Sequence, residues 1–311
     1  NSPGLAKNLK QFGQVIPAAI MGRDSRCPLP YDRTATDVDK MFYGVGAMFY
    51  DGRDKACRIS NETPCQSSSQ LVMDGDMVIT TAHTFRDKIS GRRMSDAEIK
   101  KFIFTVKVWV PRELRRDSNE AYEWRYYDVE DYEFGTDDEE RNPNKDYAFI
   151  KLRERVGARV GPLDQNWNEI KSQAMAVPKD KQVPVLPFKK LDRTALPNVV
   201  MTVGFSSDKK TVVQKNCEPF RLFDPPAGHP SLSHPGLLIH DGDTGSTSSG
   251  SALTLLNGNK PHFAALHRGT FWRGSKTFEG PFDLNSRFNE AIDSNSFYDH
   301  FMEFRRKFGR N

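Results

Sequence analysis

Short apolar runs separated by turn residues dominate the chain from about residue 41 onward. Residues 102–110 alternate between two sets of side chains with a period of two, which is typical of a strand that buries one face. Further short runs of this kind lie at 147–152, 199–203, 237–239, 252–256 and 262–266. Because helical segments do not alternate with these runs, the pattern disfavours a parallel sheet and predicts antiparallel barrels or sandwiches.

Two dipeptides mark tight turns between apolar runs. They are Asp74-Gly75, within residues 70–80, and Asn257-Gly258. Asp-Gly and Asn-Gly supply the positive φ angles that two-residue hairpin turns require. Both dipeptides are therefore expected to join antiparallel strands.

The C-terminal end carries a helical pattern. Four phenylalanines recur there at intervals of four, three and four, namely Phe297, Phe301, Phe304 and Phe308. This spacing predicts an amphipathic helix that packs its aromatic stripe on the body of the protein. Ser296 is the expected N-cap, and the basic residues 305–307 suit the negative end of the helix dipole.

Composition limits the classes of partner. The chain has 45 Lys and Arg against 41 Asp and Glu, and a net charge of +4 gives little reason to expect nucleic acid or an anionic membrane as the main partner. No apolar run approaches the roughly 18 residues of a membrane span. The 21 Phe, 9 Tyr and 4 Trp argue against disorder.

Cysteine and acidic residues suggest structural roles. Cys27, Cys57, Cys65 and Cys217 show no CxxC spacing, so we expect one or two structural disulfides in an exported protein, or else buried thiols, among three possible pairings. The segment 128–140 is rich in Asp and Glu and is expected to be a solvated acidic loop, with a cation site or a contact for basic ligands as alternatives. The ligand spacing of a calcium loop is not met, and no metal site is predicted.

Three groups of residues carry possible chemistry. His83 follows the apolar strand 77–81 directly, where a rigid element would hold a partly buried general base. Asp146 stands at the start of the alternating run 147–152. Residues 241–252 are rich in Gly, Ser and Thr, so their backbone can turn tightly and direct N–H groups toward a developing oxyanion.

The order of these groups carries a resemblance. Thr81-Ala82-His83, the Asp-x-Ala-x-Ile-x-Leu that starts at Asp146, and the Ser-Gly-Ser-Ala that starts at Ser249 resemble the three signature blocks of chymotrypsin/trypsin-like serine proteases. The stretches 203–209, 243–252 and 266–269 resemble the bacterial glutamyl-endopeptidase-like branch. The resemblance covers roughly residues 41–285.

The resemblance implies an all-β fold of two antiparallel six-stranded β-barrels with the active site between them. Residues 1–40 would be an N-terminal extension, 41–160 the first barrel, 161–285 the second barrel and 286–311 a C-terminal helix. The extension, with a short helix expected at 8–19, would be a propeptide, a clamp around the body or a partner-binding arm. The segment 111–144 is a candidate loop for restricting substrate access.

The resemblance also implies a mechanism. Ser249 would be the nucleophile, His83 the general base and acid, and Asp146 the group that orients the imidazole. The backbone N–H groups of Thr247 and Ser249 would form the oxyanion hole. The protein would be a secreted or periplasmic bacterial serine endopeptidase that acts on proteins or peptides through an acyl-enzyme, with no metal or organic cofactor. Its oligomeric state stays open.

Three departures separate the chain from the family pattern. Thr247 stands where the family usually has Gly, and its Cβ would hinder the peptide conformation of the oxyanion hole. Ser248 replaces the Asp with which trypsin pairs its new N-terminus, so that activation switch is absent. Thr84 replaces the Cys that follows the histidine in animal enzymes. By composition alone, Ser248 and Ser251 are rival nucleophiles.

The residues expected around the substrate pocket do not settle its preference. They are Asp243, Thr244, Ser246, His267, Arg268 and Thr270. His267, Ser246 and Thr270 lie where glutamyl endopeptidases hold a substrate carboxylate, which favours cleavage after Glu or Asp. Asp243 lies where trypsin keeps the carboxylate that binds Arg or Lys, although branch members with Asp there also cleave after Glu. Arg268 adds positive potential, which favours acidic substrates.

Three alternatives remain open. The departures at Thr247 and Ser248 are compatible with a pseudo-protease that acts as a binding module. The same triad would also serve an esterase. If the three blocks resemble the family by coincidence, His83, Asp146 and Ser249 should lie far apart in space.

Overall fold

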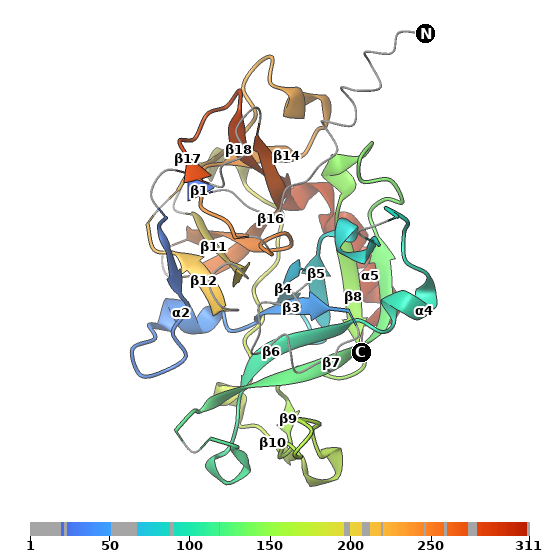
Figure 1. Cartoon of the computed structure of the whole chain (residues 1–311), viewed down its shortest axis with the longest axis vertical. Helices are drawn as coiled ribbons and strands as arrows, with labels where there is room; N and C mark the ends of the chain where they lie inside the picture. The colour runs from blue at the N-terminus through green and yellow to red at the C-terminus, as the bar shows by residue number, and fades with distance from the viewer. Residues whose placement is uncertain are drawn as a thin grey trace.

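Two antiparallel β layers pack against each other, with the longest helix against the first layer (Figure 1). The computed structural model describes residues 20–21, 24–50, 67–87, 90–117, 119–195, 200–206, 212–218, 220–245, 247–257, 260–272 and 279–309. The expected helix at 8–19, Asn257-Gly258 as a complete turn, and Cys57 and Cys65 lie outside these residues. None of the described helices is long and apolar enough to cross a membrane.

The first layer is a closed six-stranded barrel in the order β3-β4-β5-β8-β7-β6. Its strands are antiparallel and comprise β3 (Val45–Phe49), β4 (Ser67–Val72), β5 (Met77–Thr80), β6 (Ile103–Trp109), β7 (Tyr122–Phe134) and β8 (Ala148–Leu152). The predicted hairpin at Asp74-Gly75 is confirmed, since it joins β4 to β5 and Gly75 adopts a φ of 78°. The first of the two expected barrels is therefore present.

The second layer is an eight-stranded sheet in the order β13-β14-β18-β16-β15-β11-β12-β2. Its strands are β2 (Arg26–Pro28), β11 (Val200–Ser206), β12 (Val212–Asn216), β13 (Leu222–Phe223), β14 (Leu237–His240), β15 (Ala252–Asn257), β16 (Lys260–Trp272) and β18 (Arg287–Asp293). The described strand pairings form an open sheet, so a second closed barrel stays a prediction. β18 pairs with β14 and β16, so strand structure continues past the expected boundary at residue 285. The division into domains stays a prediction.

Smaller elements complete the structure. β1 (Ile20–Met21) pairs in parallel with β17 (Glu279–Gly280), and β9 (Arg159–Val160) pairs with β10 (Met175–Ala176). The helices are α2 (Asp37–Met41), α4 (Asp96–Ile99) and α5 (Tyr298–Phe308). Thr36 and Ser95 cap α2 and α4 through complete capping boxes, which satisfy their first backbone N–H groups.

The acidic segment is not the loop that its composition predicts. Its first part, Asp128 to Phe134, is the end of β7, which pairs with both β6 and β8. Strand pairing along β7 also shows that much of the segment 111–144 is barrel wall. The expectation of a solvated acidic loop is therefore wrong for this part, because backbone pairing overrides the low strand propensity of Asp and Glu.

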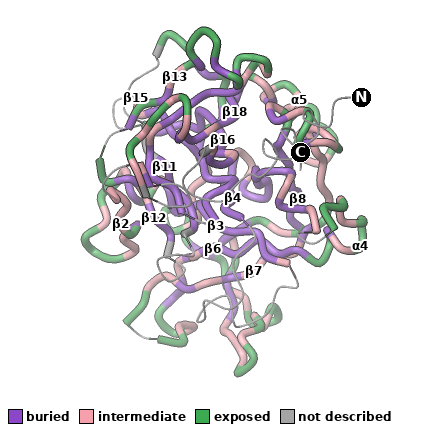
Figure 2. Tube along the Cα trace, turned by 45° about the horizontal axis from the view of Figure 1, so that its top comes forward, coloured by how far each residue is buried: buried purple, intermediate pink, exposed green. Residues whose placement is uncertain are grey.

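Alternation along the strands builds three separate apolar clusters, one of which, including Leu238 and Leu253, belongs to the second sheet alone. Another takes residues from all six barrel strands, including Val78, Phe104 and Ile150, and fills the barrel. The third takes the opposite faces, including Met77 and Ile79, and joins them to the second sheet and to α5. Figure 2 shows the buried positions along these strands and the exposed ones mainly on the outer loops. The strand 102–110 is thus buried on both faces along much of its length, which its one-sided pattern did not predict.

The N-terminal strap, defined here as residues 20–21 and 24–29, contributes the edge strand β2 to the second sheet. β2 pairs with β12, and a disulfide joins Cys27 to Cys217 with a Cα–Cα distance of 5.8 Å. The Leu29 N–H donates to the Val213 carbonyl at 2.8 Å. One structural disulfide is thereby confirmed. The role of residues 1–40, as a propeptide, a clamp or a partner-binding arm, stays a prediction.

Helix α5 packs its aromatic stripe as predicted. Phe297, Phe301 and Phe304 are buried, and the Phe301 ring meets Phe149 of the barrel and Phe188 at centroid distances of 5.2 and 5.1 Å. The predicted Ser296 cap is wrong. Residues Ser294–Ser296 form a 3-10 turn that Asp293 caps, and α5 begins two residues after Ser296 without a side-chain cap.

We predict that Phe301→Ala lowers the free energy of unfolding by about 3–5 kcal/mol, because it leaves a cavity where α5 meets the barrel. Urea denaturation measures this loss. Phe308→Ala, at the partly exposed end of the same stripe, is the matched control and should cost clearly less. Equal losses would mean that α5 does not depend on the Phe301 contact.

Candidate active site

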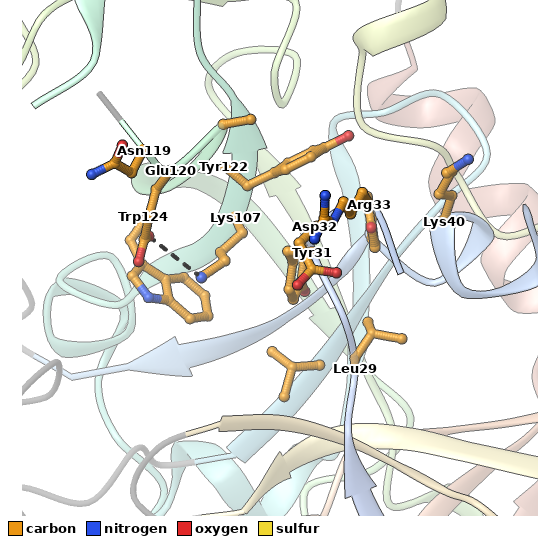
Figure 3. A pocket seen from close by; sticks show the side chains of 13 residues that line it. Leu29, Tyr31, Asp32, Arg33, Lys40, Lys107, Asn119, Glu120, Tyr122 and Trp124 are labelled. Carbon is orange, nitrogen blue, oxygen red and sulfur yellow. Dashed lines mark ion pairs between the residues drawn. The ribbon is translucent and has the colours of Figure 1, made fainter. Parts of the chain in front are cut away.

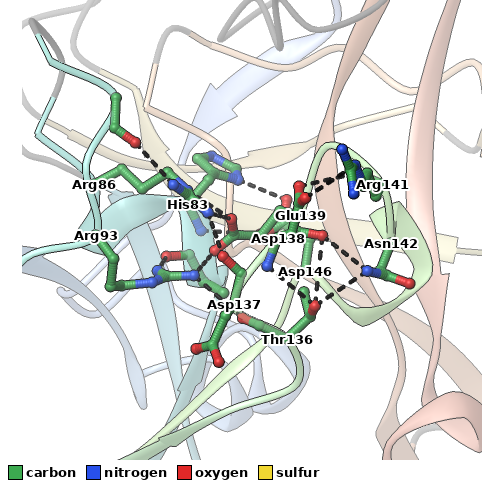
Figure 4. Close-up of polar contacts among 12 residues, drawn as sticks. His83, Arg86, Arg93, Thr136, Asp137, Asp138, Glu139, Arg141, Asn142 and Asp146 are labelled. Carbon is green, nitrogen blue, oxygen red and sulfur yellow. Dashed lines mark hydrogen bonds and ion pairs between the residues drawn. The ribbon is translucent and has the colours of Figure 1, made fainter.

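His83 and Asp146 meet because two neighbouring barrel strands carry them. His83 lies in a 3-10 turn (Ala82–Phe85) directly after β5, and Asp146 lies just before β8. The pairing of Thr80 with Ala148 brings the ends of these strands together. The His83 ring Nδ1 lies 2.7 Å from Asp146 Oδ2, and the His83 backbone N–H donates to Oδ1 at 2.9 Å (Figure 4).

The Asp146 carboxylate is fully buried. Burial alone would raise the pKa of Asp146, but the facing His83, its two hydrogen bonds and the guanidinium of Arg268 together hold that pKa below its ordinary value. The carboxylate therefore stays charged and accepts the Nδ1 proton. This fixes the tautomer in which His83 Nε2 can accept a proton from a nucleophile.

Two arginines and a buried glutamate brace the turn that carries His83. Arg93 donates to the Ala82 carbonyl and to Glu139, and Arg86 Nε donates to Glu139 at 2.6 Å (Figure 4). Burial, followed by the charge of Arg86, lowers the pKa of Arg93 to about 10, so Arg93 stays cationic at neutral pH. Nothing in the sequence indicates these ion pairs, because only its buried position distinguishes Glu139 from the neighbouring acidic residues.

Ser249 lies on the Gly- and Ser-rich loop that leads into β15. The loop turns tightly at Gly245, whose N–H donates to Ser248 Oγ at 2.6 Å. Ser249 Oγ donates to the Arg268 carbonyl at 3.0 Å, and no hydrogen bond joins it to His83 among the described residues. Ser248 Oγ accepts a hydrogen bond within this turn and Ser251 is fully buried, while Ser248 and Ser249 are each 5% exposed. The choice of Ser249 as the nucleophile stays a prediction.

Ser68 of β4 fixes the serine loop to the barrel. Its N–H lies within hydrogen-bond distance of the carbonyls of Thr247 (2.9 Å) and Ser249 (2.8 Å), and its hydroxyl donates to Thr247 at 2.8 Å. Gly250 has a φ of 89°, and a Cβ there would lie 2.0 Å from the Ser68 carbonyl oxygen. Only glycine fits this close approach, so β4 holds the loop at one depth relative to the barrel.

The predicted oxyanion hole is described only in part. In the described part of the chain, the Ser249 N–H donates to no acceptor, as a hole donor should. The Thr247 N–H belongs to the peptide that starts at Ser246, which lies outside the described residues. The contribution of Thr247 therefore stays a prediction.

Arg268 links the serine loop to the His–Asp pair. Its Nε lies 3.2 Å from Asp146 Oδ2, and its Nη1 donates to Glu290 at 2.9 Å. Its own carbonyl accepts the Ser249 hydroxyl. The arginine therefore pairs with two carboxylates rather than facing an open pocket.

The other predicted pocket residues gather around buried polar partners. His267 Nδ1 lies 3.0 Å from His240 Nε2, and both rings are fully buried. Burial lowers the pKa of His240 to about 3, and burial followed by the charges of His240 and His83 holds the pKa of His267 well below its ordinary value, so both rings are neutral at neutral pH. The hydroxyls of Thr244 and Thr270 both donate to the Asn289 side chain.

Asp243 binds the N-terminal strap. Its carboxylate accepts hydrogen bonds at 2.7 Å from the backbone N–H groups of Met21 and Ser25 and from the Ser25 hydroxyl. Asp243 is 5% exposed. Both carboxylate oxygens therefore accept hydrogen bonds from the strap, which competes with any basic substrate side chain for this carboxylate.

Elsewhere, the described residues include no group of three or more His, Cys, Asp or Glu that could hold a metal ion.

A separate groove of about 790 Å³ lies between the strap and the β6–β7 hairpin (Figure 3). None of the residues discussed above as site residues lines it. Tyr31, Tyr122 and Trp124 form part of its wall, and the Lys107 ammonium lies 5.0 Å from the centre of the Tyr31 ring.

Comparison of the chain with protein-family models and with curated proteins finds no match. The arrangement of these side chains is therefore the basis for any functional proposal.

We predict that Asp243→Ala lowers the free energy of unfolding by about 1–3 kcal/mol, because three donors of the strap lose their acceptor. Chemical denaturation under oxidising conditions measures the loss. Asp180→Ala, which removes an exposed carboxylate paired with Lys181, is the control and should cost less. A loss no larger than that of the control would show that the strap does not depend on Asp243.

Proposed function

We propose that this chain is a serine endopeptidase of the chymotrypsin-like type, with its active site between the barrel and the second sheet. The observation that carries the proposal is the hydrogen-bonded pair of His83 and the buried Asp146, together with Arg268, which contacts both Asp146 and the Ser249 hydroxyl. A buried carboxylate that orients an imidazole is the arrangement needed to activate a hydroxyl. The Cys27–Cys217 disulfide supports a secreted or periplasmic location.

In the proposed reaction, Ser249 turns from the Arg268 carbonyl toward His83. Its oxygen attacks the substrate carbonyl carbon while His83 Nε2 takes the hydroxyl proton, and the carbonyl electrons move onto the oxygen. The C–N bond then breaks, and His83 returns the proton to the leaving amine. Water attacks the acyl-enzyme by the same proton transfers and releases the acid and free Ser249.

The oxyanion is stabilised by the N–H of Ser249, together with that of Thr247. Such fixed donors commonly contribute about 2.7–4 kcal/mol each to transition-state stabilisation. Asp146 keeps its negative charge throughout and stabilises the imidazolium that forms in the transition state.

We propose an acidic residue before the cleaved bond. Asp243 is occupied by the strap, which disfavours a basic side chain at this place. The neutral His267 ring, whose Nε2 has no hydrogen-bond partner among the described residues, is an uncharged group that can donate to a carboxylate. Burial of a substrate carboxylate without such donors would cost several kcal/mol.

A second candidate function is that of a pseudo-protease that binds peptides without cleaving them. The observation that favours it is the Ser249 hydroxyl donating to Arg268 rather than to His83. An esterase would use the same three side chains, and only the ratio of ester to peptide turnover separates it from a peptidase.

We predict that the protein cleaves members of a mixed peptide library after Glu or Asp, with loss of at least about 10³-fold in kcat/KM in Ser249→Ala. Mass spectrometry of the products locates the cleaved bonds. Ser248→Ala is the matched control and should retain most of the activity. Binding of library peptides without cleavage would favour the pseudo-protease, and cleavage after Lys or Arg would contradict the acidic preference.

A further inference from the structure

Arg268 occupies an irregular position in β16. His267 pairs with Ala291 of β18 and Gly269 pairs with Glu290, so the register shifts at the residue between them. Arg268 is thus the extra residue of a β-bulge. Bulges of this kind redirect a side chain out of the regular alternation and are frequent beside active sites.

We propose that Arg268 is a positioning residue that holds its cation against Asp146, so that His83 shares the negative charge of this carboxylate with a second cation. This inference rests on the proposed function and concerns the same site.

The geometry makes Arg268 act through its charge. Its Nε lies 3.2 Å from Asp146 Oδ2 but lacks hydrogen-bond geometry to any described acceptor. Nη1 is anchored by Glu290, whose other oxygen accepts the Ser231 hydroxyl at 2.6 Å. The Arg268 side chain is only 12% exposed, so solvent screens this charge weakly.

The charges around the pair come from several elements. Arg268 faces Asp146 from β16, with Glu290 of β18 behind it. Arg93 interacts with Asp146 from the other side, and Arg86 and Glu139 surround Arg93. The ring of His267 lies near His83 and is neutral.

These charges determine the direction of the effect. The cation of Arg268 competes with the imidazolium form of His83 for the single negative charge of Asp146. Its removal leaves more of that charge to the imidazolium, which favours protonation of His83. Removal of the Glu290 charge has the opposite effect, because it leaves the Arg268 cation less compensated.

The test is the NMR titration of the His83 ring, assigned by comparison with His83→Ala, in the full-length protein. Arg268→Gln is expected to raise the midpoint by roughly one pH unit, and Arg268→Lys should keep it near the wild-type value. Glu290→Gln is expected to lower it. In an active protein, the acid limb of the kcat/KM profile moves in the same directions.

Arg306→Gln removes an exposed arginine of α5 and is the control for net charge, with an unchanged midpoint expected. An unchanged midpoint in both Arg268→Gln and Glu290→Gln would overturn the inference. Because the midpoint is read from the imidazole, a wild-type protein that cleaves no peptide contradicts the proposed function, while the titration still decides the role of Arg268.

Discussion

The position of the candidate site depends on one polar contact between the two layers. In this contact, Ser68 of the barrel is hydrogen-bonded to the serine loop, the Gly- and Ser-rich segment within residues 241–252. The backbone N–H of this barrel residue serves the carbonyls of Thr247 and Ser249, and its hydroxyl accepts the N–H of Phe205 at 2.7 Å while donating to Thr247. Buried backbone groups must find partners, so these bonds fix where the loop of one layer meets the strand of the other. The absence of a Cβ at Gly250 permits the approach.

The remaining site geometry follows from that contact. The barrel carries His83 and Asp146 at the ends of two adjacent strands, and the loop seated on Ser68 carries Ser249. Arg268 spans the gap, with its carbonyl on Ser249 and its guanidinium on Asp146. The strap holds the start of the same loop through Asp243. A shift of the serine loop on Ser68 would therefore move the proposed nucleophile, Ser249, relative to the proposed base, His83.

Local signals predicted a good part of this arrangement. Asp74-Gly75 predicted a hairpin because the dipeptide itself supplies the backbone conformation of a tight turn. The phenylalanine stripe of α5 was predicted from the spacing of these residues alone. The contact of His83 with Asp146 was expected only from the order of motifs and the resemblance. Of the three residues that a coincidental match would leave apart, His83 and Asp146 lie within hydrogen-bond distance of each other.

Contacts between residues far apart in the chain could not be predicted from local sequence patterns. The strap on Asp243 joins residues more than 200 positions apart, and nothing in the local sequence of either end specifies the other. The role of Glu139 depends on two arginines that come from the turn after His83. Ser296 does not cap α5, because it belongs to a 3-10 turn whose N-terminus is capped by the Asp293 side chain. In each case a tertiary partner or a competing local bond outweighed the sequence pattern.

The most direct measurement of the central claim is covalent labelling with a fluorophosphonate probe, followed by peptide mass spectrometry, on the wild-type protein and His83→Ala. The account predicts an adduct on Ser249 that is lost in His83→Ala, since only an activated hydroxyl displaces fluoride at a useful rate. An adduct on Ser248 or Ser251, or equal labelling of the two proteins, would contradict it. Absence of any adduct in the wild-type protein would also contradict the assignment of Ser249 as an activated nucleophile.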